Sequence, residues 1–192
     1  MFWRFPALIL ILLLSEKKPL FHPKKDPLVL FAAFAALVAT GFFAALAADK
    51  TGFSPPMDIP QPVGLLGWIG VILFSLSIGA LEEAYFRLYL PLRILELFPA
   101  RSASAEYSAD LGRTEAGGPD RTGHTITVAF VLSGLTFALC HAYEGPWGIA
   151  NALLASFVLS FAYIKSSSFP GIALAHGLYN VFVFLTSANS LQ

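Results

Sequence analysis

The feature that most constrains the fold is a long apolar run, Val63 to Leu81, that leads directly into three charged residues. These are Glu82, Glu83 and Arg87, and apolar residues resume after them. A run of this length predicts a transmembrane helix. A charge at the centre of a bilayer costs roughly 2.5–3.5 kcal/mol, so an ionisable residue inside a span indicates a functional site. The alternative is that the span ends near Leu81 and the charges lie among the lipid headgroups.

The helical phase separates the two glutamates. At about 3.6 residues per turn, Glu83 and Arg87 lie on one face, with the acid N-terminal to the base as an ion pair prefers. Glu82 is turned about 100° away and has no partner within its own segment. We therefore expect Glu83 and Arg87 to have a structural role, and the carboxylate of Glu82 to be free for chemistry.

Composition places the chain in a membrane. Of its 192 residues, 56% are hydrophobic and 12% are charged, whereas soluble domains carry about 25% charged residues. The net charge is zero, which gives no electrostatic reason to expect nucleic acid as a partner. Cys140 is the single cysteine, so an intramolecular disulfide is excluded. The sequence predicts an all-α, polytopic transmembrane helical bundle.

The apolar segments predict five spans, or six if the first of them crosses the membrane. Phe2 to Leu14 is short for a span and is either a first crossing or an interfacial anchor. Pro91 is expected to break or kink the second of the five spans. The five are Leu28 to Ala48, Val63 to Leu90, His124 to Cys140, Ile149 to Ile164, and Phe169 to Thr186.

The same segments suggest a division of the chain into two regions. Residues 1–62 hold N-terminal membrane segments and linkers, and residues 63–187 form a core that carries the polar residues. Within that core, residues 99–124 are rich in Ser, Gly, Arg and Asp and lack a hydrophobic period, which indicates a flexible loop.

Three more polar residues stand in apolar surroundings, on two other segments. His141 ends one segment, with Phe137 four residues before it on the same helical face. His176 and Asn180 are also four apart on one face of the last segment. Each alone is explained by a hydrogen bond between helices. Together with Glu82, they predict one polar site inside the bundle, because unpaired polar groups in hydrocarbon are costly.

In chain order, these residues form three motifs that resemble those of the CPBP family of intramembrane proteases, also called the Abi or CAAX-protease family. The motifs are Glu-Glu-x-x-x-Arg (82–87), Phe-x-x-x-His (137–141) and His-x-x-x-Asn (176–180). The resemblance covers about Val63 to Phe184 and implies an active site within the helical bundle.

The resemblance also implies roles for these residues. Glu82 and His141 would bind and activate water, with Glu82 as general base, and His176 and Asn180 would stabilise the oxyanion. Glu83, Arg87 and Phe137 would support them. No cofactor is expected. The implied substrate is a membrane-anchored protein or peptide, the other partner is the lipid bilayer, and the implied location is the bacterial inner membrane.

Three alternatives stay open at this stage. Two histidines and a glutamate are a known zinc set, so Glu82, His141 and His176 could belong to a metalloprotease, although a local His-Glu-x-x-His signature is absent. The chain could instead be a non-catalytic immunity or scaffold protein, or a small transporter with a proton relay. One geometric difficulty also arises. If the predicted spans cross the membrane alternately outward and inward, Glu82 and His141 lie at different depths in the membrane.

Overall fold

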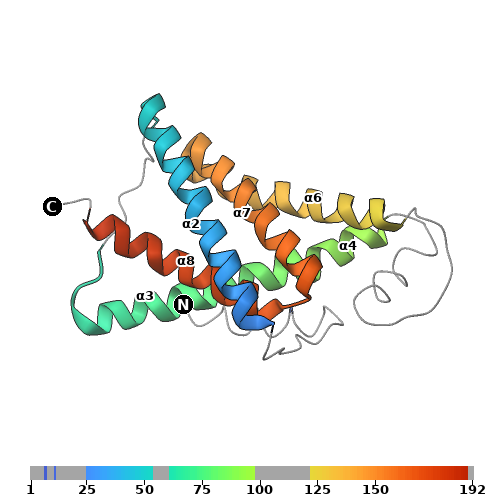
Figure 1. Ribbon diagram of the computed structural model, residues 1–192, viewed down its shortest axis with the longest axis horizontal. Coiled ribbons are helices and arrows are strands. Elements are labelled where there is room, and N and C mark those ends of the chain that lie inside the picture. Colours follow the sequence, from blue (N-terminus) through green and yellow to red (C-terminus); the bar gives the residue numbers. More distant parts are fainter. Residues whose placement is uncertain (1–6, 8–10, 12–24, 54–60, 98–121, 190–192) are drawn as a thin grey trace.

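The computed structural model describes residues 7, 11, 25–53, 61–97 and 122–189, and every regular element in them is helical. The predicted all-α fold is confirmed (Figure 1). The helices are α2 (Asp26–Thr51), α3 (Gly64–Glu83), the π-helix η1 (Ala84–Tyr89), α4 (Leu90–Glu96), α6 (Thr122–Cys140), the 3-10 helix η2 (Ala142–Glu144), α7 (Gly145–Ser166) and α8 (Phe169–Asn189).

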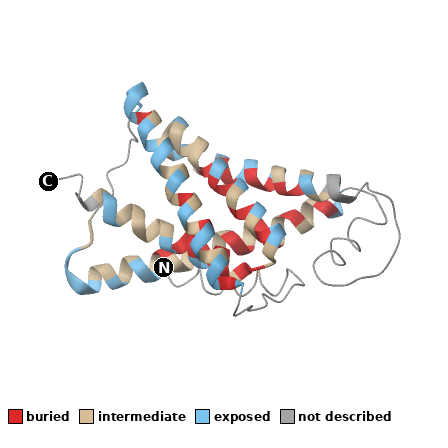
Figure 2. Cartoon of the chain, viewed as in Figure 1, coloured by how far each residue is buried: buried red, intermediate tan, exposed pale blue. Residues whose placement is uncertain are grey.

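Among the described residues, four helices are long and apolar enough to cross a membrane, and the apolar part of α6 is a shorter fifth. The predicted polytopic membrane bundle is confirmed, and the chain is an integral membrane protein. Many residues with large apolar side chains are exposed, as contact with lipid requires; exposed residues occur along the helices in Figure 2. The four spans are Asp26–Thr51, Gly64–Glu96, Ala142–Ser166 and Phe169–Ser187, and the shorter helix is Ile126–Cys140.

Two predicted segments lie largely outside the described residues. Of Phe2 to Leu14, only Ala7 and Ile11 are described; both are helical, and Ile11 packs against the core. The predicted loop at 99–124 also falls mostly outside them. Helix α6 begins at Thr122, so the last residues of that loop are helical.

Glycines allow α3 and α8 to pack backbone against backbone. A Cβ atom added to Gly79 would lie 2.6 Å from the backbone nitrogen of Gly177, and one added to Gly177 would lie 2.8 Å from the Cα of Leu76. Small residues permit such close approach between membrane helices, where dispersion contacts replace the hydrophobic effect. The pair α3 and α8 thus brings the motif on one helix beside the motif on the other.

The remaining helices surround this pair. Helix α2 packs on α7 and α8, and α6 packs on α7 and on α4 (Figure 1). The start of α2 is tied to the turn between α7 and α8, because the Ser168 hydroxyl donates a hydrogen bond to the buried Asp26 carboxylate. The fully buried side chains of Leu37, Leu159 and Ile172 come from α2, α7 and α8 and join them in one core.

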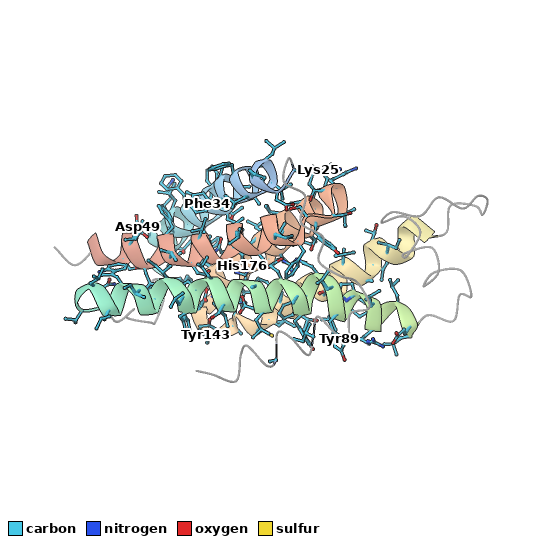
Figure 3. All side chains as sticks on the ribbon, turned by 90° about the horizontal axis from the view of Figure 1, so that it is seen from below. Lys25, Phe34, Asp49, Tyr89, Tyr143 and His176 are labelled. Carbon is cyan, nitrogen blue, oxygen red and sulfur yellow. The ribbon has the colours of Figure 1, made fainter. Side chains whose placement is uncertain are left out.

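Helices α3, η1 and α4 form one continuous rod, Gly64–Glu96 (Figure 3). Pro91 is expected to break or kink the helix; the helix continues through it without a break, and a wide π turn precedes it. In this turn the Leu90 amide donates to the carbonyl of Tyr85, five residues back. Continued by one residue, this spacing would pair the Pro91 nitrogen with the carbonyl of Phe86, but proline has no N–H to donate.

The carbonyl of Phe86 finds another donor. The hydroxyl of Ser133, on α6, donates a hydrogen bond to it at 2.7 Å, and both groups are buried. A neighbouring serine is one of the ways in which membrane helices satisfy a carbonyl freed by proline. This hydrogen bond allows the helix to continue past Pro91, and it holds α6 against the second half of the rod.

Candidate active site

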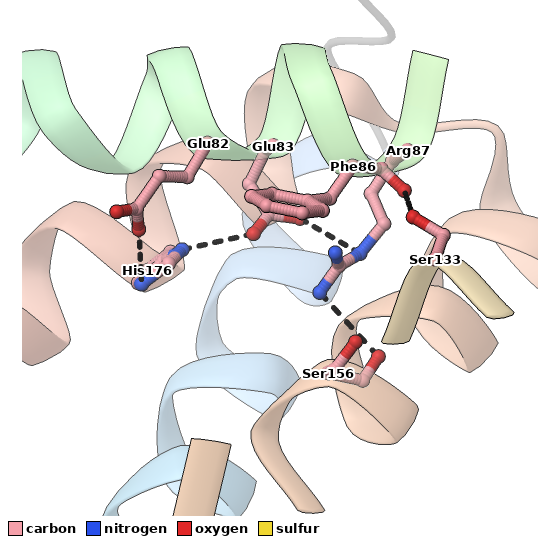
Figure 4. A network of polar contacts seen from close by, with 7 residues as sticks. All are labelled: Glu82, Glu83, Phe86, Arg87, Ser133, Ser156 and His176. Atoms are coloured by element: carbon pink, nitrogen blue, oxygen red, sulfur yellow. Dashed lines mark hydrogen bonds and ion pairs between the residues drawn. The ribbon is translucent and has the colours of Figure 1, made fainter. Parts of the chain in front are cut away.

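A chain of buried polar contacts runs from α7 through the long rod to α8 (Figure 4). Arg87 Nη2 lies 3.4 Å from the carbonyl oxygen of Ser156, and its Nε lies 3.2 Å from Glu83 Oε2. Glu83 Oε1 is 2.8 Å from His176 Nδ1, and His176 Nε2 is 3.5 Å from Glu82 Oε2. His176 therefore lies between the two adjacent glutamates.

The structure gives Glu83 a second contact that the sequence prediction did not include. The predicted ion pair of Glu83 with Arg87 is present, and both side chains are fully buried. Glu83 also accepts a hydrogen bond from His176 Nδ1. A carboxylate in an ion pair only accepts hydrogen bonds, so Nδ1 carries a proton and Nε2 faces Glu82. Glu83 thus sets the orientation and tautomer of His176.

The two glutamates differ in their access to the cavity. The side chain of Glu82 is 24% exposed, whereas that of Glu83 is 0% exposed. A reacting group has to reach a substrate, so the geometry agrees with a division in which Glu82 is available and Glu83 is held. The cost of burying Glu83 is offset by Arg87 and His176 together.

His141 stands just after the end of α6 and is held by the preceding turn. Its Nδ1 lies 2.8 Å from the carbonyl oxygen of Phe137. A carbonyl only accepts, so Nδ1 is the donor and a neutral ring leaves Nε2 as an acceptor. The Phe137 ring is 4.5 Å from the imidazole, measured between ring centroids, and the Tyr143 ring is nearly parallel to it at 6.1 Å. The Phe137 ring therefore lies beside the imidazole, as the shared helical face predicted.

All four residues predicted to be catalytic line one cavity of about 520 Å³. Its wall comes from helices α2, α3, α6, α7 and α8 and from η2, and His176 lies on the α8 side of the rod (Figure 3). The lining residues are Leu37, Phe74, Ser75, Ile78, Glu82, Phe137, His141, Tyr143, Glu144, Asn151, Ala152, Ala155, His176, Tyr179, Asn180, Val183 and Phe184.

The length of the rod removes the expected difference in depth between Glu82 and His141. Gly64–Glu96 has 33 residues, or about 50 Å at 1.5 Å per residue, so Glu82 lies near its middle. Helix α6 packs along the second part of the rod, on α4 and η1. The end of α6 therefore reaches the level of Glu82, and His141 enters the same cavity.

Five polar lining residues were missed from the sequence: Ser75, Tyr143, Glu144, Asn151 and Tyr179. Asn151 gave a usable signal, because it is an amide near the start of an apolar segment, as Asn180 is within another. Tyr179, directly before Asn180, was hidden by the frequency of aromatic residues in this chain. Tyr143 and Glu144 lie in the short turn η2, between the segments that hydropathy identified.

The donor set was also compared with the geometry of metal sites. Among the described residues, no group of three or more His, Cys, Asp or Glu side chains is arranged to hold a metal ion. Glu82, His141 and His176 line one cavity, but the contacts around them connect the side chains to one another and to backbone.

Comparison with known proteins agrees with the motifs. Searches of curated proteins and of solved structures returned no match to the chain. A family model described as type II CAAX prenyl endopeptidase Rce1-like matches residues 64–182. The match covers more than half of the chain and spans all three motifs, from the start of α3 into α8. The chain therefore belongs to the Rce1-like family of type II CAAX prenyl endopeptidases.

Proposed function

We propose that this protein is an intramembrane endopeptidase that hydrolyses a peptide bond of a membrane-anchored protein or peptide. The observation that carries the proposal is the arrangement around His176. Its Nε2 faces the partly exposed Glu82, while its Nδ1 is held by the buried Glu83–Arg87 pair. His141 and Asn180 line the same cavity.

Water activation is assigned to Glu82 and His141. The carboxylate of Glu82 and Nε2 of neutral His141 are both acceptors that line the cavity. A water molecule between them donates one hydrogen to each, which leaves an oxygen lone pair for attack on a carbonyl carbon. Glu82 takes the proton as the attack proceeds, and it later returns a proton to the leaving amine. These steps require no metal ligand.

Oxyanion stabilisation is assigned to His176 and Asn180. The two residues are four apart on α8 and line the cavity together. The amide of Asn180 supplies N–H donors, and His176 Nε2 donates when its ring carries both protons. Donors held in place before the reaction stabilise the developing charge without reorganisation. The hydrogen bond to Glu83 holds the His176 ring in this position.

The other lining residues favour an apolar substrate. Leu37, Phe74, Ile78, Val183 and Phe184 form much of the wall. A peptide with a lipid or apolar anchor would reach this wall from the bilayer, in keeping with the endopeptidase family to which the chain belongs. We assign the protein to the bacterial inner membrane, with its substrate anchored in the same membrane.

The test uses the full chain in liposomes with internally quenched, lipid-anchored peptides. The panel includes a farnesylated peptide with a CAAX-type C-terminus and a peptide of the same sequence on a transmembrane anchor. We expect hydrolysis by the wild-type chain and a loss of about 10²–10⁴-fold in the Glu82→Gln variant, as for removal of a general base.

The matched control is Glu96→Gln, which changes an exposed glutamate on the same rod. This variant should retain the wild-type rate. If Glu82→Gln folds normally and still hydrolyses the peptides at the wild-type rate, Glu82 is not the base. A different outcome is that the wild-type chain cleaves no peptide in the panel, while cells that carry Glu82→Gln behave like cells that carry the wild-type chain. The protein would then act without catalysis.

A further inference from the structure

A second polar group lies in the wall of the cavity, apart from the four residues assigned to catalysis. Asn151, on α7, and Tyr179, on α8, both line the cavity. The Asn151 side-chain amide donates a hydrogen bond to the Tyr179 hydroxyl at 3.3 Å. The catalytic assignments above use neither side chain.

The Tyr179 hydroxyl occupies a space that the fold leaves for it. Gly41 lies in the middle of α2, where glycine costs about 1 kcal/mol relative to alanine. A Cβ atom added to Gly41 would collide with the Tyr179 hydroxyl. Three helices thus position this group: α2 provides the space, α7 the hydrogen bond and α8 the side chain.

Asn151 has hydrogen-bonding capacity left over. Its Oδ1 atom is buried and finds no hydrogen-bond partner among the described residues. Leaving a buried acceptor unpaired costs about 1–3 kcal/mol, and such an atom in a native structure calls for a partner. Because Asn151 lines the cavity, a rotation of its side chain can turn Oδ1 toward a bound molecule that supplies the missing donor. The Tyr179 hydroxyl, which accepts from Asn151, keeps its own proton to donate.

An acceptor beside a donor fits one residue of an extended peptide, because the N–H and C=O of that residue point to the same side of the strand. The charges around the cavity argue against a free carboxylate. Glu82 and Glu144 line it, and none of its described lining residues is Lys or Arg. A neutral backbone group is therefore the better ligand. A peptide about to be cleaved must be extended, and in an apolar cavity its backbone groups need partners.

We propose that Asn151 and Tyr179 bind the backbone N–H and C=O of one residue of the extended substrate, close to the scissile bond. Asn151 Oδ1 accepts the substrate N–H, and the Tyr179 hydroxyl donates to a substrate carbonyl. Tyr179 follows His176 by three residues on α8, a rise of about 4.5 Å. An extended peptide advances about 3.3 Å per residue, so the bound residue is one or two positions from the bond that breaks. The inference rests on the proposed function.

The experiment measures binding separately from cleavage. Fluorescence anisotropy follows labelled, lipid-anchored peptides binding to the full chain in nanodiscs, with Glu82→Gln present to prevent turnover. Each peptide is compared with analogues in which one backbone amide is replaced by an ester. We expect one ester position to weaken binding about fivefold, and Asn151→Ala to weaken binding of the all-amide peptide by a similar factor. The two changes together should weaken it no further.

Two more variants complete the test. Tyr179→Phe should weaken binding, whereas Tyr163→Phe should not, because Tyr163 is buried in the core away from the cavity lining. In the cleaving enzyme, Asn151→Ala should raise KM with little change in kcat. Independent, multiplying losses from the ester and from Asn151→Ala would overturn the inference, as would a lack of saturable binding. A third outcome separates the two proposals. If the ester and Asn151→Ala weaken binding by the same factor and together weaken it no further, but the wild-type chain cleaves no peptide, only the proposed function is refuted.

Discussion

His176 Nδ1 lies 2.8 Å from Glu83 Oε1, across 93 residues of sequence. The glutamate that local spacing assigns to a structural ion pair is thus also the residue that orients a histidine of the candidate site. Glu83 connects the stability of the long rod with the geometry of α8. A substitution there should change both, and the two effects can be separated.

Glu83→Gln should destabilise the protein by about 3–5 kcal/mol, because it leaves the buried guanidinium of Arg87 without a compensating charge. The measurement is the denaturation midpoint in detergent micelles. Glu96→Gln removes one partner of an exposed ion pair with Arg93 and should cost less than about 1 kcal/mol. Equal costs for the two variants would contradict a strong buried pair.

The double variant Glu83→Gln/Arg87→Met should recover much of that stability, since it removes both buried charges. Peptide hydrolysis should remain low, because His176 still lacks the carboxylate that holds its Nδ1. Recovery of hydrolysis together with stability would show that Glu83 acts through the ion pair alone.

Ser133→Ala should cost about 1–3 kcal/mol, because it leaves the buried carbonyl of Phe86 without a donor. Pro91→Ala restores a backbone N–H opposite this carbonyl, so Ser133→Ala should cost less in the Pro91→Ala background. Thermal unfolding of the four proteins in this cycle gives the coupling energy. Thr136→Ala is the control, since its exposed hydroxyl bonds within its own helix. If the changes in unfolding free energy from Ser133→Ala and Pro91→Ala are strictly additive, the Ser133 hydroxyl does not replace the N–H that Pro91 lacks.

Gly79→Ala should lower stability by about 1–3 kcal/mol, because the added methyl group meets the backbone of α8 at Gly177. It should also reduce hydrolysis, since it moves His176 away from the glutamates. Gly70→Ala is a matched control on the same helix, where an added Cβ meets nothing within 4 Å. Alanine there should be neutral or slightly stabilising. Similar effects of both changes would argue against close helix contact as the cause.

Removal of metal should leave hydrolysis intact if Glu82 is a general base rather than a zinc ligand. The purified chain is treated with 1,10-phenanthroline and its metal content is measured before and after. We expect less than about 0.1 zinc per chain and an unchanged rate, because a catalytic zinc is held by three protein ligands that bind it strongly. One zinc per chain, with activity lost on chelation and restored by added zinc, would establish the metalloprotease alternative.

The sequence predicted those parts of the fold and site that depend on local spacing. Long apolar runs predicted the helices, and four-residue spacings predicted the Glu83–Arg87 pair and the placement of Phe137 beside His141. Polar residues in apolar segments are few in this chain because they are costly in hydrocarbon. For this reason His176, like the others, could be identified without an alignment.

Contacts between helices were beyond the reach of local patterns. The bond between Ser133 and the Phe86 carbonyl depends on a π turn, which changes the partner of each carbonyl by one residue. The second contact of Glu83 likewise depends on how closely α3 and α8 approach, and the glycines that allow it lie on different helices. Periodicity within one helix contains no information on either distance.

The cavity wall also includes a helix that lies outside the family match. Leu37 lines the cavity from α2, and Gly41 on the same helix leaves space for the Tyr179 hydroxyl, while the matched residues begin at 64. The residues proposed to react and part of the cavity wall are thus encoded in separate stretches of the chain. On the proposed function, exchanging α2 between family members should alter which peptides fit while leaving the proposed catalytic residues in place. Selectivity and chemistry could then change independently of each other.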